Sequence, residues 1–216
     1  MEFYSIVAFF QKGGLFMYPI MLVFAVGMAI TVERWLQLRR TQSVNSKMWD
    51  LVHPVLAEGE FDKAREMVNK DKSNMAKMLE MGLARQGAVR RREDIEIAME
   101  ESMMEIIPQL ERRTPYVALL ANIATLLGLL GTIMGLIAAF TAVAAANPAE
   151  KADLLSASIS VAMNTTAFGL MSAIPLLLFH AMLTSTTGQI VDSLEMASVK
   201  ALNTISNFAK RHFERN

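Results

Sequence analysis

Threonine, serine and asparagine side chains are the groups able to do chemistry in the most apolar part of this chain. The stretch between Arg113 and Glu150 carries no formal charge, and neither does the stretch between Asp153 and Asp192. Each is long enough to cross the ~30 Å hydrocarbon core of a bilayer, which takes about 20 apolar residues in a helix. Both are rich in Thr, Ser, Asn, Gly and Ala, which mark helix–helix contacts or a polar path rather than a simple anchor. The pattern predicts a membrane protein whose working part lies between these two helices.

A third uncharged apolar stretch lies near the start of the chain, from Gly13 to Val32, and meets Glu33-Arg34-Trp35 at its end. Its length suits a membrane span better than a signal peptide, and no small-residue cleavage site follows it. Tyr18 and Trp35 are amphipathic rings of the kind found near lipid headgroups. The sequence therefore predicts an all-α membrane protein with three transmembrane helices.

Lysine and arginine residues gather on one side of these spans. They follow the first span and the third and precede the second, for example at Arg39, Arg40, Arg112, Lys200 and Lys210. The positive-inside rule then places the N-terminus outside and the C-terminus inside. The predicted organisation is an outer segment 1–12, a transmembrane helix 13–35, a cytoplasmic helical domain 36–114, a transmembrane helix 115–146, an outer turn 147–152, a transmembrane helix 153–187 and a cytoplasmic helix 188–216.

The inner segment has a helical pattern. Phe61, Ala64, Met67 and Val68 recur at helical spacing with charged residues between them, as expected of amphipathic helices. Gly87 is expected to break the chain before the basic triplet Arg90-Arg91-Arg92. That triplet suits either an anionic ligand such as lipid or nucleic acid, or a solvated helix end beside acidic neighbours, and the second interpretation is favoured.

Composition and local motifs exclude several functions. Lys and Arg together number 21, as do Asp and Glu, which argues against a general affinity for nucleic acid. There is no Cys, so thiolate catalysis and Cys-based metal sites are excluded. The 17 Met residues are interpreted as core and lipid-facing fillers rather than a soft metal site. The acidic run Glu93, Glu96, Glu100 and Glu101 fits an exposed helix face with no His nearby, so neither metal, cofactor nor enzymatic activity is predicted.

Two prolines are expected to shape the apolar helices. Thr114-Pro115 reads as an N-cap followed by Pro at the first helical position, with a bend between the 93–113 helix and the helix that begins there. Pro175 lies inside the third span, where the missing N–H should kink the helix and free a carbonyl.

A proton relay at depth in lipid needs a titratable group, usually Asp, Glu or His. His180 is the only such residue in the three uncharged stretches. It lies toward the inner end of its span and is better interpreted as an interfacial or packing histidine. A proton channel built from this chain therefore needs a partner that supplies the proton carrier.

Two runs carry a family resemblance. LLGLLGTIMGLIAAF from Leu126 to Phe140, followed by TTAFGLMSAIP from Thr165 to Pro175, resembles the MotA/TolQ/ExbB proton-channel family. The opening GGLFMYPIMLVFAVGMAITVERW is similar to that family's first span. The short outer turn and modest cytoplasmic domain look most like the ExbB/TolQ branch. That branch carries a glutamate five residues before Thr166, where this chain has Val161, which leaves no acidic side chain at that position.

The resemblance implies an energy-transducing complex of the bacterial inner membrane, with a periplasmic N-terminus and a cytoplasmic C-terminus. Members form a homo-oligomeric ring, typically a pentamer, around the single membrane helices of two ExbD/TolR-like subunits that carry the proton-accepting Asp. Proton flow then drives work on a TonB-like protein, on another envelope system, or on a flagellar or gliding apparatus.

The resemblance also singles out Thr132 and Thr166 as lining the proton pathway and facing the partner, with Thr165 and Asn164 as secondary candidates. The alternative is that each threonine hydroxyl bonds back to the carbonyl four residues earlier. Two other functions stay open: a non-conducting membrane scaffold, and a small-solute transporter, which three spans without an internal repeat make less favoured.

The orientation gives a first prediction. Reporter fusions at Asn147 and at Lys72 should report opposite sides of the membrane, Asn147 outside and Lys72 inside, because the Lys and Arg bias places them so. Activity of the same topology reporter at both positions would contradict the three-span arrangement.

Overall fold

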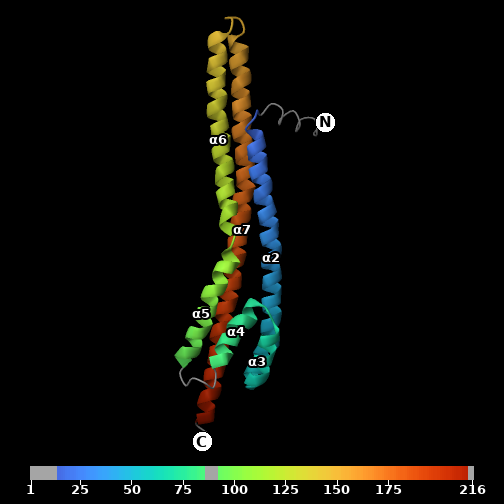
Figure 1. The fold of residues 1–216 in the computed structure, drawn as a ribbon, viewed down its shortest axis with the longest axis vertical. Coiled ribbons are helices and arrows are strands. Elements are labelled where there is room, and N and C mark those ends of the chain that lie inside the picture. The colour runs from blue at the N-terminus through green and yellow to red at the C-terminus, as the bar shows by residue number, and fades with distance from the viewer. Residues whose placement is uncertain (1–13, 86–91, 214–216) are drawn as a thin grey trace. The chain divides into compact units, whose positions relative to one another are not determined.

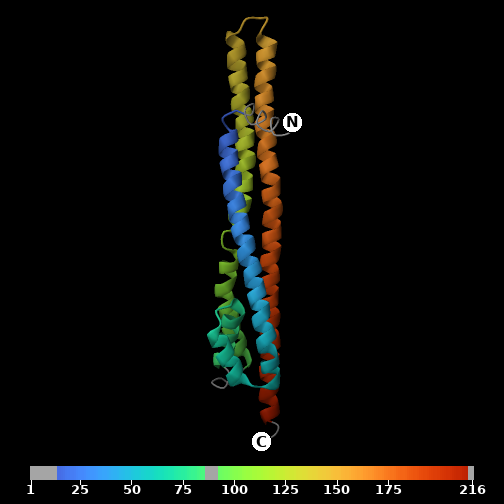
Figure 2. The same ribbon diagram turned by 90° about the vertical axis from the view of Figure 1, so that its right-hand side faces the viewer.

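The computed structural model describes residues 14–85 and 92–213, and every regular element in this part of the chain is an α-helix. The structure thus confirms the all-α class predicted above (Figures 1 and 2). The predicted outer segment 1–12, Gly87, Arg90 and Arg91 lie outside the described residues. The helices are α2 (Met17–Glu58), α3 (Phe61–Lys70), α4 (Asn74–Arg85), α5 (Arg92–Glu111), α6 (Thr114–Ala145) and α7 (Lys151–Phe213).

Three candidate membrane spans follow from helix length and composition: Met17–Glu58, Arg92–Ala145 and Lys151–Phe208. Each contains most or all of one of the three uncharged stretches. Three membrane-crossing segments are therefore consistent with the structure as well as with the sequence, although the exact span boundaries stay predictions.

The chain divides into two compact units. The apolar unit contains the described residues up to Arg34 together with Arg113–Met182, and the polar unit contains Trp35–Arg112 together with the residues from Leu183 onward. In the apolar unit the first part of α2, all of α6 and the first part of α7 lie side by side (Figures 1 and 2). This unit holds the candidate site.

Small residues set the helix spacing in the apolar unit. A Cβ added at Gly27 of α2 would lie 2.8 Å from a side-chain carbon of Leu176 of α7. A Cβ added at Gly135 of α6 would lie 2.9 Å from the Cβ of Ala162 of α7. Lipid tails are as apolar as the helix surfaces, so no hydrophobic driving force holds membrane helices together. Close packing of small residues stabilises the contact between the helices instead.

The start of α6 differs from the prediction. Thr114 was expected to be the N-cap, but Arg113 occupies that position with φ 67°, and no side chain caps the helix. Thr114 is instead the first helical residue and is buried, and Pro115 is the second helical residue rather than the first. The left-handed conformation of Arg113 turns the chain one residue earlier than the Thr-Pro signal indicates. The expected bend therefore appears as a two-residue break, Arg112-Arg113, between α5 and α6.

The Arg113 side chain also forms an ion pair with Glu33 of α2. Both side chains are about half exposed, so the pair is worth at most about 1 kcal/mol. Its structural role is to hold the start of α6 beside the end of the apolar part of α2.

Pro175 lies within α7, which continues through it. The residue therefore does not end the helix. The kink and the freed carbonyl expected there stay predictions.

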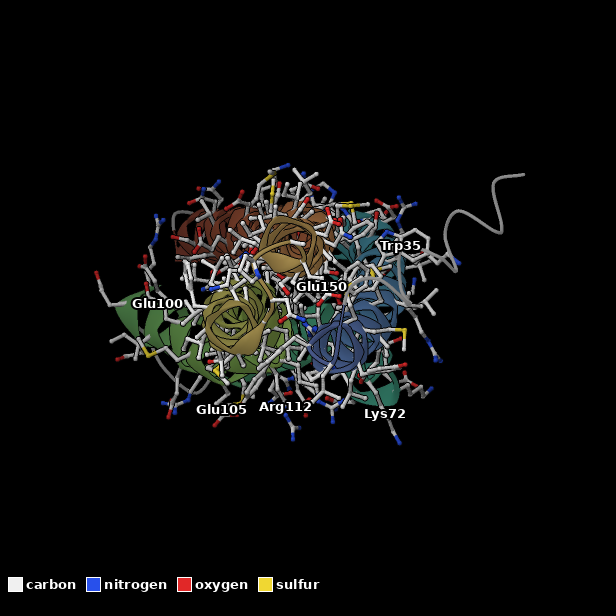
Figure 3. The ribbon with its side chains drawn as sticks, turned by 90° about the horizontal axis from the view of Figure 1, so that it is seen from above. Trp35, Lys72, Glu100, Glu105, Arg112 and Glu150 are labelled. Atoms are coloured by element: carbon white, nitrogen blue, oxygen red, sulfur yellow. The ribbon has the colours of Figure 1, made fainter. Side chains whose placement is uncertain are left out.

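The polar unit packs α3, α4 and α5 together, with buried Met75, Leu79 and Met99 in its core. Ser73 directly precedes α4 and acts as its N-cap. Its hydroxyl oxygen accepts a hydrogen bond from the Ala76 N–H at 3.1 Å. Helices predicted over these segments are confirmed. Figure 3 labels two carboxylates of α5, Glu100 and Glu105. The whole predicted acidic run is exposed, at Glu93, Glu96, Glu100 and Glu101.

The close contact of α6 with α7 gives a second prediction. Gly169→Ala should destabilise the protein by about 1–3 kcal/mol, because overpacking of a tight contact forces backbone shifts. Its new Cβ would lie 2.8 Å from the backbone oxygen of Ala124 and 3.0 Å from the Cα of Gly128, neither of which can rotate away. Thermal unfolding in mild detergent measures the change.

Gly188→Ala in the same helix is the matched control. Nothing lies within 4 Å of its added Cβ, so the substitution should be neutral or stabilising by up to about 1 kcal/mol through helix propensity. Equal loss of stability in both variants would show that the glycine contact is not what holds α6 against α7.

Candidate functional site

The candidate site lies where α6 and α7 run antiparallel with their backbones close together. Gly128 of α6 faces Gly169 of α7: a Cβ added at Gly128 would lie 3.2 Å from the Gly169 Cα and 3.3 Å from the Thr166 Cα. With no side chain between them, the backbones approach closely enough for side chains of one helix to reach carbonyls of the other. This approach positions the predicted threonines.

Thr132 and Thr166 meet across this contact. Their hydroxyl oxygens are hydrogen-bonded to each other, and either is able to donate. Thr166 also donates to the carbonyl oxygen of Gly128 on α6, at 3.0 Å. The structure therefore brings together the two principal residues predicted from the sequence.

Thr132 has further acceptors within reach. Its hydroxyl lies 3.3 Å from the Gly128 oxygen of its own helix and 3.3 Å from the Ala162 oxygen of α7. A hydroxyl has one proton to donate, so Thr132 has three possible acceptors for it. Both side chains are half buried. The site is thus a hydroxyl pair on a cradle of two backbone carbonyls, which we call the threonine pair.

The sequence raised an alternative in which each threonine hydroxyl bonds back to the carbonyl four residues earlier. This alternative holds for some threonines and not for others. Thr165 donates to the Val161 oxygen at 3.0 Å, and Thr141 donates to the Ile137 oxygen at 2.9 Å. Thr132 combines the back-bond with bonds across to α7, whereas Thr166 donates across to α6. Thr132 and Thr166 are thus hydrogen-bonded between helices, whereas the bonds described for Thr141 and Thr165 stay within their own helices.

The two secondary candidates do not join the pair. Thr165 is 2 % exposed, and its methyl group covers Gly131, whose added Cβ would lie 2.3 Å from it. Asn164 is half buried and lies two residues before Thr166, so it points about 200° around α7 from that residue. Thr165 packs between the helices, and Asn164 belongs to a different face of α7.

The threonine pair is remote from formal charge along the chain. Thr132 is nearly equidistant in sequence from Arg113 and Glu150, which end the uncharged stretch of α6. His180 lies fourteen residues beyond Thr166 on α7, about 21 Å along a helix. His180 therefore cannot exchange a proton directly with the pair. The pair offers donors and acceptors but no titratable group of its own.

Sequence reasoning missed the shared role of Gly128. Its missing side chain admits α7, and its carbonyl oxygen accepts from both threonines. The available signal was the recurrence of small residues every four positions, at Ala124, Gly128 and Thr132. The Glu33–Arg113 pair was also missed, because Glu33 and Arg113 are 80 positions apart.

A double-mutant cycle gives the third prediction. Thr132→Val and Thr166→Val should each lower stability by about 0.5–1.5 kcal/mol, the net worth of a typical hydrogen bond, and the double variant should lose less than the sum because the two hydroxyls share one bond. Thermal or denaturant unfolding in detergent measures the coupling. Thr141→Val is the control, because the Thr141 hydroxyl is exposed and bonded within its own helix. Strictly additive losses of stability in Thr132→Val and Thr166→Val would show that the bond between the two hydroxyls contributes nothing.

No individual curated protein matches the chain. A family model described as the MotA/TolQ/ExbB proton channel family matches residues 70–196, which include α5, α6 with Thr132, and the part of α7 with Thr166. The match covers more than half of the chain, which therefore belongs to the MotA/TolQ/ExbB proton channel family.

Proposed function

We propose that this chain is the ExbB/TolQ-like subunit of a proton-driven motor in the bacterial inner membrane. In this role it couples the proton motive force to mechanical work on envelope partners, of the kind that a TonB-like protein delivers to outer-membrane transport. The observation that carries the proposal is the threonine pair, which supplies polar groups far from any formal charge between two helices of a proton-channel family. The proposal assigns no enzymatic activity and no cofactor.

A partner must supply the group that carries the proton. The threonine pair cannot be protonated or deprotonated near neutral pH, and His180 is too far along α7 to serve it. The proposed partner is an ExbD/TolR-like subunit with one membrane helix bearing an Asp, in two copies. A hydroxyl is suited to this Asp because it donates to an ionised carboxylate and accepts from a protonated one.

The hydrogen bonds that break and form when an Asp contacts the threonine pair are similar in free energy to the transfer of one proton across the membrane. In the partner-free chain the two threonines satisfy each other, with a net worth of about 1 kcal/mol. A hydrogen bond to an ionised carboxylate is worth about 1.5–3 kcal/mol. A proton crossing the membrane releases about 2.3 kcal/mol per 100 mV. The driving force is therefore large enough to make and break the carboxylate–threonine contact in each cycle.

The proposed assembly is a homo-oligomeric ring, with a pentamer as the expected size, set in lipid. The small-residue faces of α6 and α7 are assigned to its interior, and the bulkier α2 to the lipid side. Large apolar side chains are exposed on α2 and just before it in the single chain, in keeping with a lipid-facing surface. They include Leu15, Leu22 and Val26. The proposed orientation has a periplasmic N-terminus and a cytoplasmic C-terminus.

Two other functions remain as alternatives. A flagellar or gliding stator subunit would use the same threonine pair with a different machine attached. A non-conducting scaffold would need no exchange at the pair, because its hydroxyls are already satisfied. Proton conduction that requires both the partner and the hydroxyls separates the scaffold from the motor.

The fourth prediction tests the motor. In vesicles containing the chain and an Asp-bearing single-span partner, Thr132→Val or Thr166→Val should reduce proton-coupled activity by about tenfold, which corresponds to a loss of roughly 1.4 kcal/mol, within the range for an unmade buried hydrogen bond. A pH-sensitive dye inside the vesicles reports proton flux. Valine keeps the side-chain size, so assembly should persist.

Thr141→Val serves as the control, because this exposed hydroxyl donates within its own helix and should tolerate the change. Wild-type flux and wild-type work in both Thr132→Val and Thr166→Val, at normal expression, would refute a role for the pair in conduction.

A further inference from the structure

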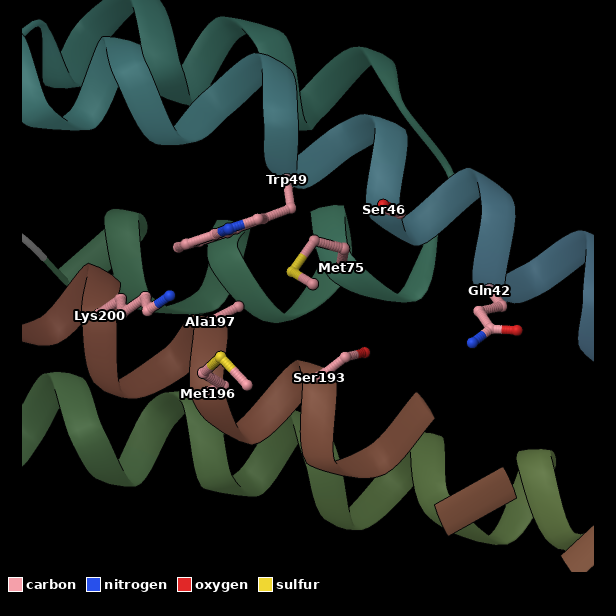
Figure 4. A pocket seen from close by; sticks show the side chains of 8 residues that line it. All are labelled: Gln42, Ser46, Trp49, Met75, Ser193, Met196, Ala197 and Lys200. Atoms are coloured by element: carbon pink, nitrogen blue, oxygen red, sulfur yellow. The ribbon is translucent and has the colours of Figure 1, made fainter. Parts of the chain in front are cut away.

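A cleft opens between α2 and α7 within the polar unit, with α4 at its back (Figure 4). It has a volume of about 220 Å³. Its apolar part is formed by Trp49 of α2, Met75 of α4 and Met196 of α7, and Lys200 supplies a charge at one end. Figure 4 shows Trp49 and Lys200 toward one end of the cleft and Gln42 toward the other.

The cleft is two helical turns long and carries one sign of charge. On α7 it extends from Ser193 to Lys200, a separation of seven residues, or about 10 Å along a helix. Among the described residues that line it, Lys200 is the only charged one. Met196 is 55 % exposed. An occupant that fits would present apolar side chains about two turns apart, with a carboxylate beside them.

The exposed face of α5 has this pattern. Ile97 and Met104 are 59 % and 72 % exposed, and their spacing of seven residues places them on one face two turns apart. Glu100 and Glu101 lie between them in sequence and are exposed as well. These two large apolar side chains on one exposed helix face are available to contact a second surface.

We propose that the exposed face of α5 of one copy of this chain docks into the cleft between α2 and α7 of a second copy. Ile97 and Met104 would fill the apolar part against Trp49 and Met196. Glu100 or Glu101 would meet the Lys200 ammonium, since none of the described residues that line the cleft is a carboxylate. The equal two-turn lengths and the opposite charges are the grounds for choosing a second copy as the occupant.

The contact is head-to-tail. α7 lies between α2 and α5 within the polar unit (Figures 1 and 4), so the cleft and the α5 face belong to different sides of the same copy. Two unlike surfaces that meet repeatedly generate a closed ring where the rotation permits. The inference rests on the self-assembly proposed above, and it names the contact through which that assembly occurs in the polar unit.

Cysteine cross-linking tests the contact directly, because the natural chain has no Cys. The full chain carrying Ile97→Cys and Met196→Cys is treated in membranes with a short bismaleimide. We expect a ladder of cross-linked species that ends at one closed size. Each single-cysteine variant should give no ladder, since a head-to-tail contact does not pair a residue with its own copy.

The matched control replaces Met196→Cys by Val44→Cys, at a position of α2 that is also exposed but does not line the cleft. Ile97→Cys with Val44→Cys should give several-fold less cross-linked product. Lys200→Glu in the Ile97→Cys, Met196→Cys background should lower cross-linking several-fold, and adding Glu100→Lys and Glu101→Lys should restore it.

The outcomes separate this inference from the proposed function. Native mass spectrometry in mild detergent reports whether the chain forms a closed oligomer. An oligomer without the 97–196 cross-link, or with equal cross-linking at 44, overturns the docking contact and leaves the ring intact. A stable monomer overturns the docking contact and the proposed ring together.

Discussion

The close approach of the α6 and α7 backbones at Gly128 and Gly169 is the constraint on which the rest of the apolar unit depends. Side chains at either position would meet backbone atoms at or below 3.2 Å, and backbone cannot move aside as a flexible side chain can. With both side chains absent, the hydroxyl of Thr166 reaches the Gly128 carbonyl, and the two threonines reach each other. The polar site is therefore a consequence of helix packing.

In the proposed motor, the placement of charge explains why a partner must supply the group that carries the proton. The pair lies near the middle of an uncharged stretch of α6, and the formal charges of the apolar unit stand at the ends of its uncharged stretches, as Glu33 and Arg113 do. A fixed charge at the depth of the pair would be costly in lipid, whereas neutral hydroxyls bonded to each other cost little. The pair therefore places polar groups at depth without a fixed charge, and neither of its hydroxyls titrates near neutral pH.

The sequence predicted this site in part, and the limit has a physical cause. Charge-free stretches identify the helices, and the resemblance singles out Thr132 and Thr166. Their meeting depends on the register between α6 and α7, which is set by contacts between residues far apart in the chain. Thr165 and Thr166 are adjacent and point about 100° apart on α7, so only the register decides that Thr166 joins the pair while Thr165 packs on Gly131. The left-handed Arg113 was likewise hidden, because Thr114-Pro115 is the stronger local signal for a helix start.

The mutual bond of the threonines also bears on how conduction is controlled. A polar group left unpaired in an apolar lumen would attract water, and water continuous across the span would let protons leak without doing work. Here each hydroxyl has the other and a backbone carbonyl as partners, so the hydrogen-bonding groups of the pair are satisfied in the absence of a carboxylate. In the proposed motor, a carboxylate gains access only by forming a stronger hydrogen bond than the one it replaces. This exchange would tie the opening of a polar path to the arrival of the proton carrier, which is the condition for proton flow to perform work.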